Sequence, residues 1–233
     1  MVCIGHQYLL LHKSFQFPER NKLDQFLVNL NSRITALRAK KMLALSFNAY
    51  ENHKNIISVP PLLRNSVLAE PKGNFSYFVA YLTNAQLLTD LTAWHFNQQD
   101  VEIHCFTKSD SNHGVKQPHK NLFVHNLDAS KFLRLMANAK GLITTAGFES
   151  VCEAIYFGKP VMMVPVPNHF EQKCNAHDAE RYGAGIAQVN FNLDSFLKFA
   201  TSYKDNSINF QNWLFEGKTR ILQEIDSLDI KLQ

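Results

Sequence analysis

The segment 144–153, with the sequence TTAGFESVCE, has the residue types of a phosphate-binding helix start. An apolar stretch precedes it, a small-residue turn ends at Gly147, and a helix is predicted to begin near Phe148. Backbone N–H groups at the start of a helix have no partner within the helix and bind anions. Gly147 lets the backbone come close to a ligand because it has no Cβ, and Ser150 adds a hydroxyl donor. The segment therefore predicts a phosphate site.

Two glutamates share one face of this predicted helix. Glu149 lies in the first turn, and Glu153 follows at the i, i+4 spacing, one turn farther from the phosphate end. A carboxylate at Glu153 is placed to accept hydrogen bonds from both hydroxyls of a ribose. The ordinary alternatives are that Glu149 interacts with the helix dipole and that Glu153 belongs to a solvated helix face.

A second polar segment, Asn168–Gln172, follows the buried run Val161–Val164. We expect it at the carboxyl end of the sheet, beside the end of the preceding strand. Its side chains offer donors and acceptors that suit sugar hydroxyls. The candidates are Glu171, Gln172 and His169, of which His169 is also a candidate phosphate contact.

The elements that must position these segments alternate between strands and helices. We predict strands at 76–82, 101–106, 122–124, 141–145, 161–164 and 186–189, and helices at 86–98, 129–138, 148–157, 172–182, 194–202 and 209–228. The segment 107–120 is predicted to be a polar loop. This alternation is typical of a parallel sheet with helices on both faces, which binds ligands beyond the carboxyl ends of its strands.

The first part of the chain contains fewer elements. Strands are predicted at 1–5, 42–47 and 56–59, and a helix at 21–40. The apolar residues of that helix fall on one face and are Phe26, Leu27, Leu30, Ile34 and Leu37. A turn-rich join at 67–73 indicates a boundary. We therefore predict an α/β protein with an incomplete N-terminal domain at 1–66, a second domain at 67–206, and a C-terminal helix at 207–233 that packs back on the N-terminal part.

Composition argues against several classes of protein. The net charge of +4 comes from 24 basic and 20 acidic residues scattered along the chain, without the basic stripe that nucleic-acid binding requires. We expect no nucleic-acid partner. A mildly basic surface is compatible with peripheral association with an anionic membrane, although a merely solvated surface is the ordinary reading.

The four cysteines are far apart and form no CxxC pair, which favours a reducing compartment. No stretch approaches the roughly 18 apolar residues of a membrane span, and the first residues do not resemble a cleaved signal. We therefore expect a cytoplasmic protein. His104, His113, His119 and His125 lack the short spacing of metal ligands, so we expect no metal site.

The segment 141–176 resembles the donor signature of GT-B glycosyltransferases. The matching residues are Gly147, Ser150, Glu153, Gly158, Pro160, Pro165, Glu171, Gln172, Asn175 and Ala176. The pattern is similar to that of the plant and animal UDP-glycosyltransferases and of the lipid-linked peptidoglycan N-acetylglucosaminyltransferase. The resemblance implies a GT-B fold with a Rossmann-like, nucleotide-sugar-binding C-terminal domain.

The same resemblance implies roles for individual residues. Gly147, Phe148 and Ser150 would receive the diphosphate, Glu153 the ribose, and Glu171 with Gln172 the donor sugar. Thr83 and Asn84 fall where the fold adds groups to the phosphates, and the segment 124–127, which ends at Leu127, falls where its backbone meets the base. This chain departs from the plant signature, which has histidine at Thr145, tryptophan at Phe148 and asparagine at Glu149.

The resemblance implies transfer of a sugar, from a UDP-linked donor, to an acceptor hydroxyl with inversion and without an obligatory metal or cofactor. His6 follows the first strand and is a candidate for the general base, and the alternative is that it is a structural histidine. The alternatives are a nucleotide-sugar 2-epimerase of the same fold and a non-catalytic donor-binding subunit. For the transferase the acceptor is unknown. Besides the nucleotide-sugar donor, we expect either a missing N-terminal half or a separate chain that supplies it.

Overall fold

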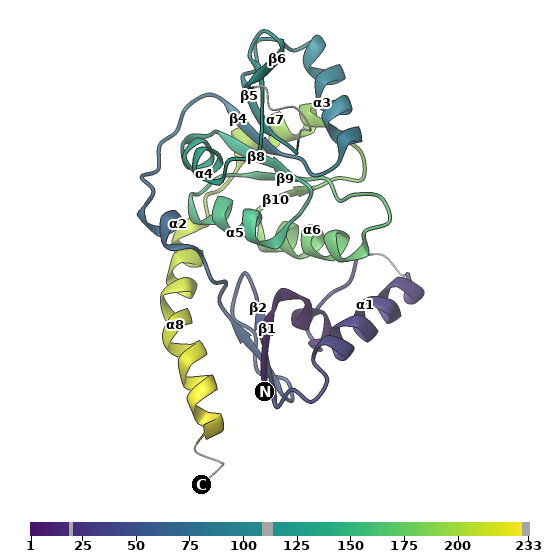
Figure 1. Cartoon of the computed structure of the whole chain (residues 1–233), viewed down its shortest axis with the longest axis vertical. Helices are drawn as coiled ribbons and strands as arrows, with labels where there is room; N and C mark the ends of the chain where they lie inside the picture. Colours follow the sequence, from purple (N-terminus) through teal and green to yellow (C-terminus); the bar gives the residue numbers. More distant parts are fainter. Residues whose placement is uncertain (19–20, 109–113, 230–233) are drawn as a thin grey trace. The chain divides into compact units, whose positions relative to one another are not determined.

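The computed structural model describes residues 1–18, 21–108 and 114–229, and the side chains of all of these except 218, 228 and 229. The chain forms two compact units: Met1–Leu62 with Ile208–Gln233, and Leu63–Ser207 (Figure 1). The division falls between residues 62 and 63, compared with 66 and 67 in the sequence-based expectation.

The first unit is built on a small parallel sheet. Its strands are β1 (Val2–Gly5), β2 (Lys41–Leu45) and β3 (Ile56–Val59), in the order β1-β2-β3. The 3-10 helix η1 (His6–Leu11) and the helix α1 (Lys22–Thr35) connect β1 to β2. All three predicted strands are therefore present.

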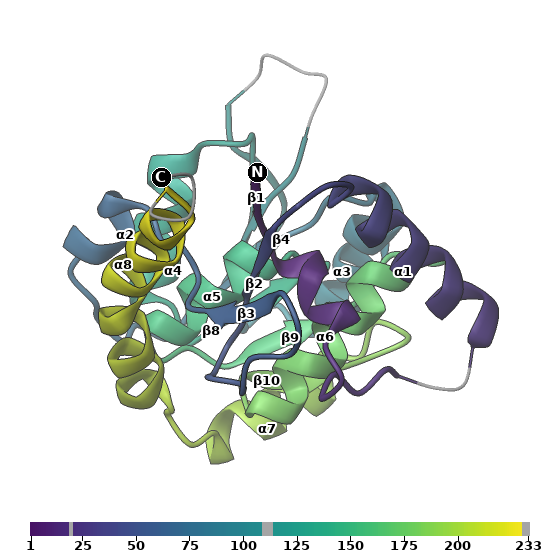
Figure 2. The same ribbon diagram turned by 90° about the horizontal axis from the view of Figure 1, so that it is seen from below.

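The last helix, α8 (Ser207–Asp229), packs on this sheet. Ile221 and Ile225 join the apolar cluster of β2 and β3. Trp213 donates its indole N–H to the Ser46 carbonyl at 3.0 Å. Within this unit, α1 and α8 flank the sheet on opposite sides (Figure 2).

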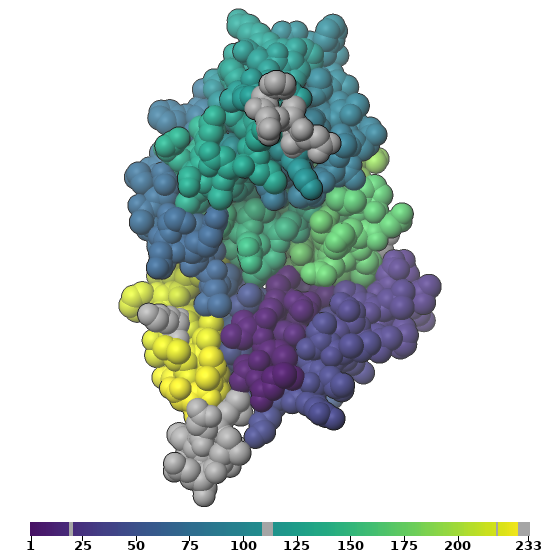
Figure 3. All heavy atoms as spheres, viewed as in Figure 1, coloured from purple at the N-terminus to yellow at the C-terminus, as the bar shows by residue number. Residues whose placement is uncertain are grey.

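The apolar face of α1 is not buried. The helix ends at Thr35, earlier than predicted, and Arg38 just beyond it has a φ of 65°, a left-handed conformation that does not continue a helix. The five apolar residues of the predicted face are 41–69% exposed in the part of the chain that the structure describes. Spheres of α1 accordingly lie at the surface in Figure 3. The 3.6-residue period thus predicted a helix correctly, while the expectation of a longer helix was wrong.

The second unit contains a seven-stranded sheet. Its strands are β4 (Phe78–Tyr81), β5 (Ile103–Phe106), β6 (Lys116–His119), β7 (Leu122–His125), β8 (Gly141–Thr144), β9 (Val161–Met163) and β10 (Gly185–Ala187). Its helices are α2 (Asn65–Ala69), α3 (Ala85–Phe96), α4 (Ala129–Asn138), α5 (Phe148–Tyr156), α6 (Phe170–Tyr182) and α7 (Leu193–Ser202). The strand order is β10-β9-β8-β4-β5-β7-β6, and every pairing except that of β6 is parallel.

Helices cover both faces of this sheet, as predicted. On one face, Leu87 of α3 and Phe196 of α7 pack into the apolar cluster of the central strands. On the other face, Phe132 of α4 contacts the rings of Tyr81 and Phe106, each at 5.4 Å between centroids. The unit is therefore a Rossmann-like layer structure.

The strand β6 corrects the expectation of an unbroken loop at 107–120. It pairs antiparallel with β7 at the edge of the sheet. Its sequence, KQPH, has no apolar alternation, and most of its side chains are exposed. Because an edge strand pairs through its backbone and tolerates proline and polar side chains, the sequence carries little signal for it.

The strand order indicates where a sheet of this type binds ligands. β4 and β8 are adjacent, and from them the chain builds outward in opposite directions, through β5 and β7 on one side and through β9 and β10 on the other. Such a reversal is a topological switch point, where open α/β sheets bind ligands beyond the carboxyl ends of their strands. The residues that follow β4 and β8 therefore belong to the candidate site.

Candidate functional site

Two threonines meet at the switch point. Thr83 follows β4 and Thr145 follows β8, and their Oγ1 atoms are hydrogen-bonded at 3.0 Å. Thr145 is buried and Thr83 is exposed. The pair joins the two strand ends, so Thr83, which sequence reasoning assigned to the phosphates, lies beside the start of the predicted phosphate segment.

The turn from β8 into α5 ends in a helix start that no side chain caps. Gly147 is the N-cap of α5, and no side chain caps the helix there. Gly147 has an ordinary φ of −67°, and a Cβ on it would meet only the Ser150 Oγ, at 3.6 Å. The left-handed position of this turn belongs instead to Ala146, whose φ is 64°. The fold itself therefore has room for a side-chain carbon at Gly147.

The first turn of α5 presents one hydroxyl and one carboxylate. Ser150 Oγ donates to the Gly147 carbonyl at 3.0 Å and lies 3.4 Å from Thr144 Oγ1. Glu149 is exposed and Phe148 is half-buried. An exposed Glu149 is free to point into solvent, so it need not oppose an anion at the helix start.

A buried amide supports the strained turn. Asn175 of α6 is 6% exposed and donates from Nδ2 to the Ala146 carbonyl at 3.3 Å. Its Oδ1 is buried and has no hydrogen-bond partner among the described residues. The motif includes Asn175, but its contact with the β8–α5 turn is visible only in the tertiary structure.

Glu153 is buried against an arginine that the sequence does not single out. Its side chain is 7% exposed, and both Nε and Nη2 of Arg64 donate to its Oε1, at 3.0 and 2.7 Å. Burial raises the pKa of Glu153, and the hydrogen bonds and charge of Arg64 act in the opposite direction. Arg64 lies 89 residues earlier in the chain, at the start of α2, so no local pattern could reveal the pair.

Side chains of the predicted sugar-contacting loop form hydrogen bonds to the backbone of the same loop. His169 is the N-cap of α6, and its Nδ1 accepts from the Gln172 backbone N–H at 3.3 Å. Gln172 turns back so that its Oε1 accepts from the Val166 N–H at 2.9 Å. Glu171 occupies the first turn of α6 and is half-buried, whereas His169 is exposed. Exposed and half-buried polar groups of this loop remain accessible to a ligand.

The other residues predicted to belong to the site, Asn84, Leu127 and His6, lie in three separate segments. Asn84 caps α3, because its Oδ1 accepts from the Gln86 N–H at 2.7 Å. Leu127 follows β7 and is 53% exposed. His6 belongs to the other unit, where it is 7% exposed and its Nδ1 donates to the Leu45 carbonyl at 2.8 Å.

A pair of histidines lies on the face that α4 covers. Glu102 Oε1 is 3.0 Å from His104 Nε2, and His104 Nδ1 is 2.9 Å from His125 Nε2. The His125 ring stacks on Phe106 at 4.8 Å between centroids. Burial lowers the pKa of His125 to about 4. No group of three or more His, Cys, Asp or Glu residues suited to a metal ion occurs in the ranges that the structure describes.

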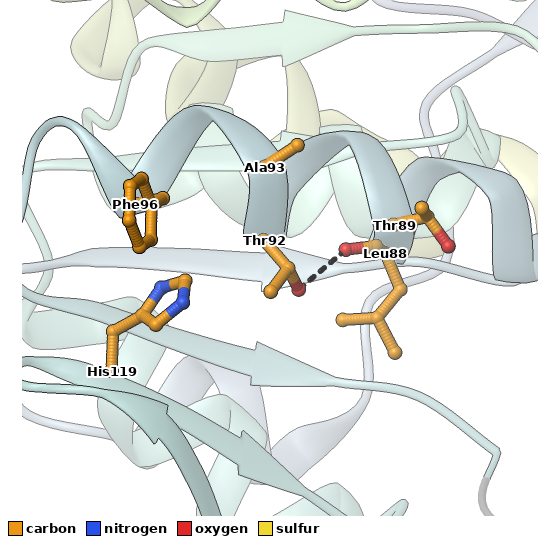
Figure 4. A pocket seen from close by; sticks show the side chains of 6 residues that line it. All are labelled: Leu88, Thr89, Thr92, Ala93, Phe96 and His119. Atoms are coloured by element: carbon orange, nitrogen blue, oxygen red, sulfur yellow. Dashed lines mark hydrogen bonds between the residues drawn. The ribbon is translucent and has the colours of Figure 1, made fainter.

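A separate hollow lies between α3 and the edge strand β6 (Figure 4). It has a volume of about 630 Å³ and is lined by Leu88, Thr89, Thr92, Ala93, Phe96 and His119. In Figure 4 the rings of Phe96 and His119 project into it from α3 and β6. None of its lining residues belongs to the switch point, and its one ionisable group is a histidine. The hollow therefore lies apart from the residues that the sequence predicts to bind phosphate, which follow β4 and β8.

No helix among the described residues combines the length and apolar composition needed to cross a membrane. No curated protein matches the chain.

The solved structures that the chain resembles are glycosyltransferases. One is the glycotransferase of kitacinnamycin, with a TM-score of 0.59 and 13% identity over 88% of this chain and 59% of that one. A second is LpCGTa in complex with UDP, with a TM-score of 0.55 and 15% identity over 93% of this chain and 58% of that one. A third is Phytolacca americana UGT2 complexed with UDP-2fluoro-glucose and pterostilbene, with a TM-score of 0.57 and 13% identity over 88% of this chain and 56% of that one. At these identities the likeness shows the fold, which is GT-B. The chain spans less than two thirds of the length of each of these relatives.

The family assignment comes from the sequence itself. The model of the family described as glycosyl transferase family 1 matches residues 1–202. These residues are most of the chain and include the segments that follow β4 and β8. The chain therefore belongs to glycosyl transferase family 1.

Proposed function

We propose that the second unit binds a nucleoside diphosphate sugar, UDP-linked, for transfer of the sugar to an acceptor hydroxyl with inversion. The observation that carries the proposal is the uncapped start of α5 at the switch point, with the buried carboxylate of Glu153 one turn beyond it. Two of the structural relatives support the donor class, since they were solved with UDP and with UDP-2fluoro-glucose.

Each part of the site has a role in this proposal. The backbone N–H groups of Phe148 and Ser150 bind the diphosphate, and Thr83 adds a hydroxyl. Glu153 accepts from the ribose, Glu171 and Gln172 contact the sugar with His169 beside them, and the backbone near Leu127 meets the base. Positive charge at a helix start stabilises an anionic leaving group, so the proposal assigns no metal to the step.

The step itself is a displacement. The acceptor oxygen forms a bond to the anomeric carbon while the bond from that carbon to the diphosphate oxygen breaks, and the diphosphate leaves with the electron pair. A general base must take the proton of the acceptor hydroxyl. The proposal assigns that role to no residue of the second unit, and the acceptor is not identified.

Calorimetric titration with UDP tests the donor site. Glu153→Gln removes the negative charge of the carboxylate at almost constant volume, and Glu149→Gln is the matched control because Glu149 lies one turn earlier and is exposed. We expect UDP binding to weaken about tenfold in Glu153→Gln, about 1.4 kcal/mol, and to change little in Glu149→Gln. Equal effects of the two variants would contradict the assigned ribose contact. Failure of the unaltered chain to bind UDP would contradict the proposal as a whole.

A further inference from the structure

Arg64 and Glu153 form an ion pair inside the second unit that the donor roles above do not explain. Arg64 precedes α2 and has a half-exposed side chain, whereas the Glu153 side chain is almost completely buried. Both hydrogen bonds from Arg64 end on the same carboxylate oxygen, Oε1. Oε2 therefore has no partner among the described residues.

A buried carboxylate without a cation is stable in its protonated form, because burial disfavours the charged state. The groups that act on Glu153 are Arg64, which favours its charge, and Glu149 on the same helix, which opposes it. Cys152 is also adjacent, and burial raises the pKa of its thiol, so it stays neutral. Among these groups, Arg64 is thus the one charge that favours the ionised form of Glu153.

The geometry of the pair also fixes the direction of the carboxylate. An arginine that donates from Nε and Nη2 restricts the group that accepts from it more than a single hydrogen bond does. With Oε1 held by the guanidinium, the lone pairs of Oε2 remain for a ligand. A diol such as the 2′ and 3′ hydroxyls of a ribose donates hydrogen bonds, and an ionised carboxylate accepts them more strongly than a neutral carboxyl does.

We propose that Arg64 is a positioning residue of the donor site, which holds Glu153 ionised and oriented so that its Oε2 accepts from the ribose of the nucleotide. This inference rests on the proposed function of the second unit. Arg64 itself touches Glu153 and not the reacting atoms. A purely structural alternative is that the pair only attaches the segment before α2 to α5.

Three variants separate these possibilities. Arg64→Gln removes the charge, Arg64→Lys keeps it but cannot reproduce the two-point contact, and Arg134→Gln is the control because Arg134 is an exposed arginine on α4 of the same unit. Circular dichroism and thermal unfolding show whether each variant folds. If Arg64→Gln does not fold, the comparison of Arg64→Lys with the unaltered chain still tests the inference.

Two readouts are measured on each protein. The first is the titration of the Glu153 carboxyl group, followed by the ¹³C NMR signal of its carboxyl carbon without nucleotide. The second is UDP affinity, measured by calorimetry from about pH 5 to about pH 8, because a buried carboxyl titrates in roughly this range. In Arg64→Gln we expect the Glu153 titration to move to higher pH and UDP binding at pH 7 to weaken about tenfold. The loss grows as the pH falls, because protonated Glu153 loses its charge. Arg64→Lys is expected to recover part of both effects, and Arg134→Gln to show neither.

The outcomes are distinguishable. Normal UDP affinity in Arg64→Gln, with an unchanged pH profile, would overturn the positioning role while the donor site stands. An equal loss of affinity at every pH, with an unmoved Glu153 titration, would also overturn it and indicate the structural alternative. If the unaltered chain does not bind UDP, both the proposed function and the positioning role of Arg64 are wrong.

Discussion

Replacing Gly147 with alanine separates the demands of the fold from those of a ligand. The φ of Gly147 is −67°, which any residue adopts, and the added Cβ would meet only Ser150 Oγ at the ordinary contact distance of 3.6 Å. Alanine is a poorer N-cap than glycine by up to about 1 kcal/mol. The lower entropy of the unfolded chain offsets this by about 0.4–1 kcal/mol. The two effects nearly cancel, so the free energy of unfolding should change by less than about 1 kcal/mol.

The same substitution should damage nucleotide binding. If a diphosphate sits against the N–H groups at the start of α5, the Cβ lies between the backbone and the phosphate oxygens and lengthens those hydrogen bonds. Losing one hydrogen bond to a charged group costs about 1.5–3 kcal/mol, which corresponds to a decrease of roughly tenfold to a hundredfold in UDP affinity. Urea unfolding and calorimetric titration with UDP measure the two quantities on the same protein.

Gly114→Ala is the matched control, because a Cβ there has no heavy atom within 4 Å. It should leave both unfolding and UDP binding unchanged. Undiminished UDP affinity in Gly147→Ala would refute the reasoning, since it would mean that no ligand approaches this backbone closely. Marked destabilisation of Gly147→Ala would refute the claim that the fold accepts a side chain here.

Three further predictions concern stability. Gly185→Ala should destabilise the second unit by at least about 3 kcal/mol in urea unfolding, because its Cβ would lie 1.7 Å from the Val161 carbonyl oxygen and β10 must separate from β9; an intact thermal transition would contradict this. Trp213→Phe should cost the first unit about 1–3 kcal/mol, since the Ser46 carbonyl loses its indole donor; an unchanged midpoint of unfolding would show that the bond is dispensable. Because burial lowers the pKa of His125 to about 4, below its unfolded value near 6.5, its contribution to stability is complete above pH 6.5 and is lost as the pH falls toward 4. In His125→Phe the decrease in unfolding free energy over this window should be smaller than in the unaltered chain, and an equal decrease would show that other groups cause it.

Local patterns in the sequence predicted most of the second unit. Alternating apolar strands and amphipathic helices indicated a Rossmann-like sheet, and that sheet is present with helices on both faces. The strand, turn and helix start of the predicted phosphate segment are present as expected, because they are contiguous and contiguous residues carry their own local geometry. The pattern was weaker where backbone pairing alone decides the structure, as in β6, whose polar and proline-containing sequence has no strand period.

The sequence by itself determined the fold class and the family signature, and it supplied the prediction of which short segments bind a phosphate or a sugar. Only the tertiary structure brought Thr83 to Thr145, 62 residues apart, because that contact depends on β4 and β8 becoming neighbours. Only the tertiary structure placed Arg64 against Glu153, and only it left the apolar face of α1 exposed in the described part of the chain. The physical reason is the same in each case: hydrophobic periodicity specifies the type of an element, whereas its partners depend on strand order and burial among residues that are remote in the sequence.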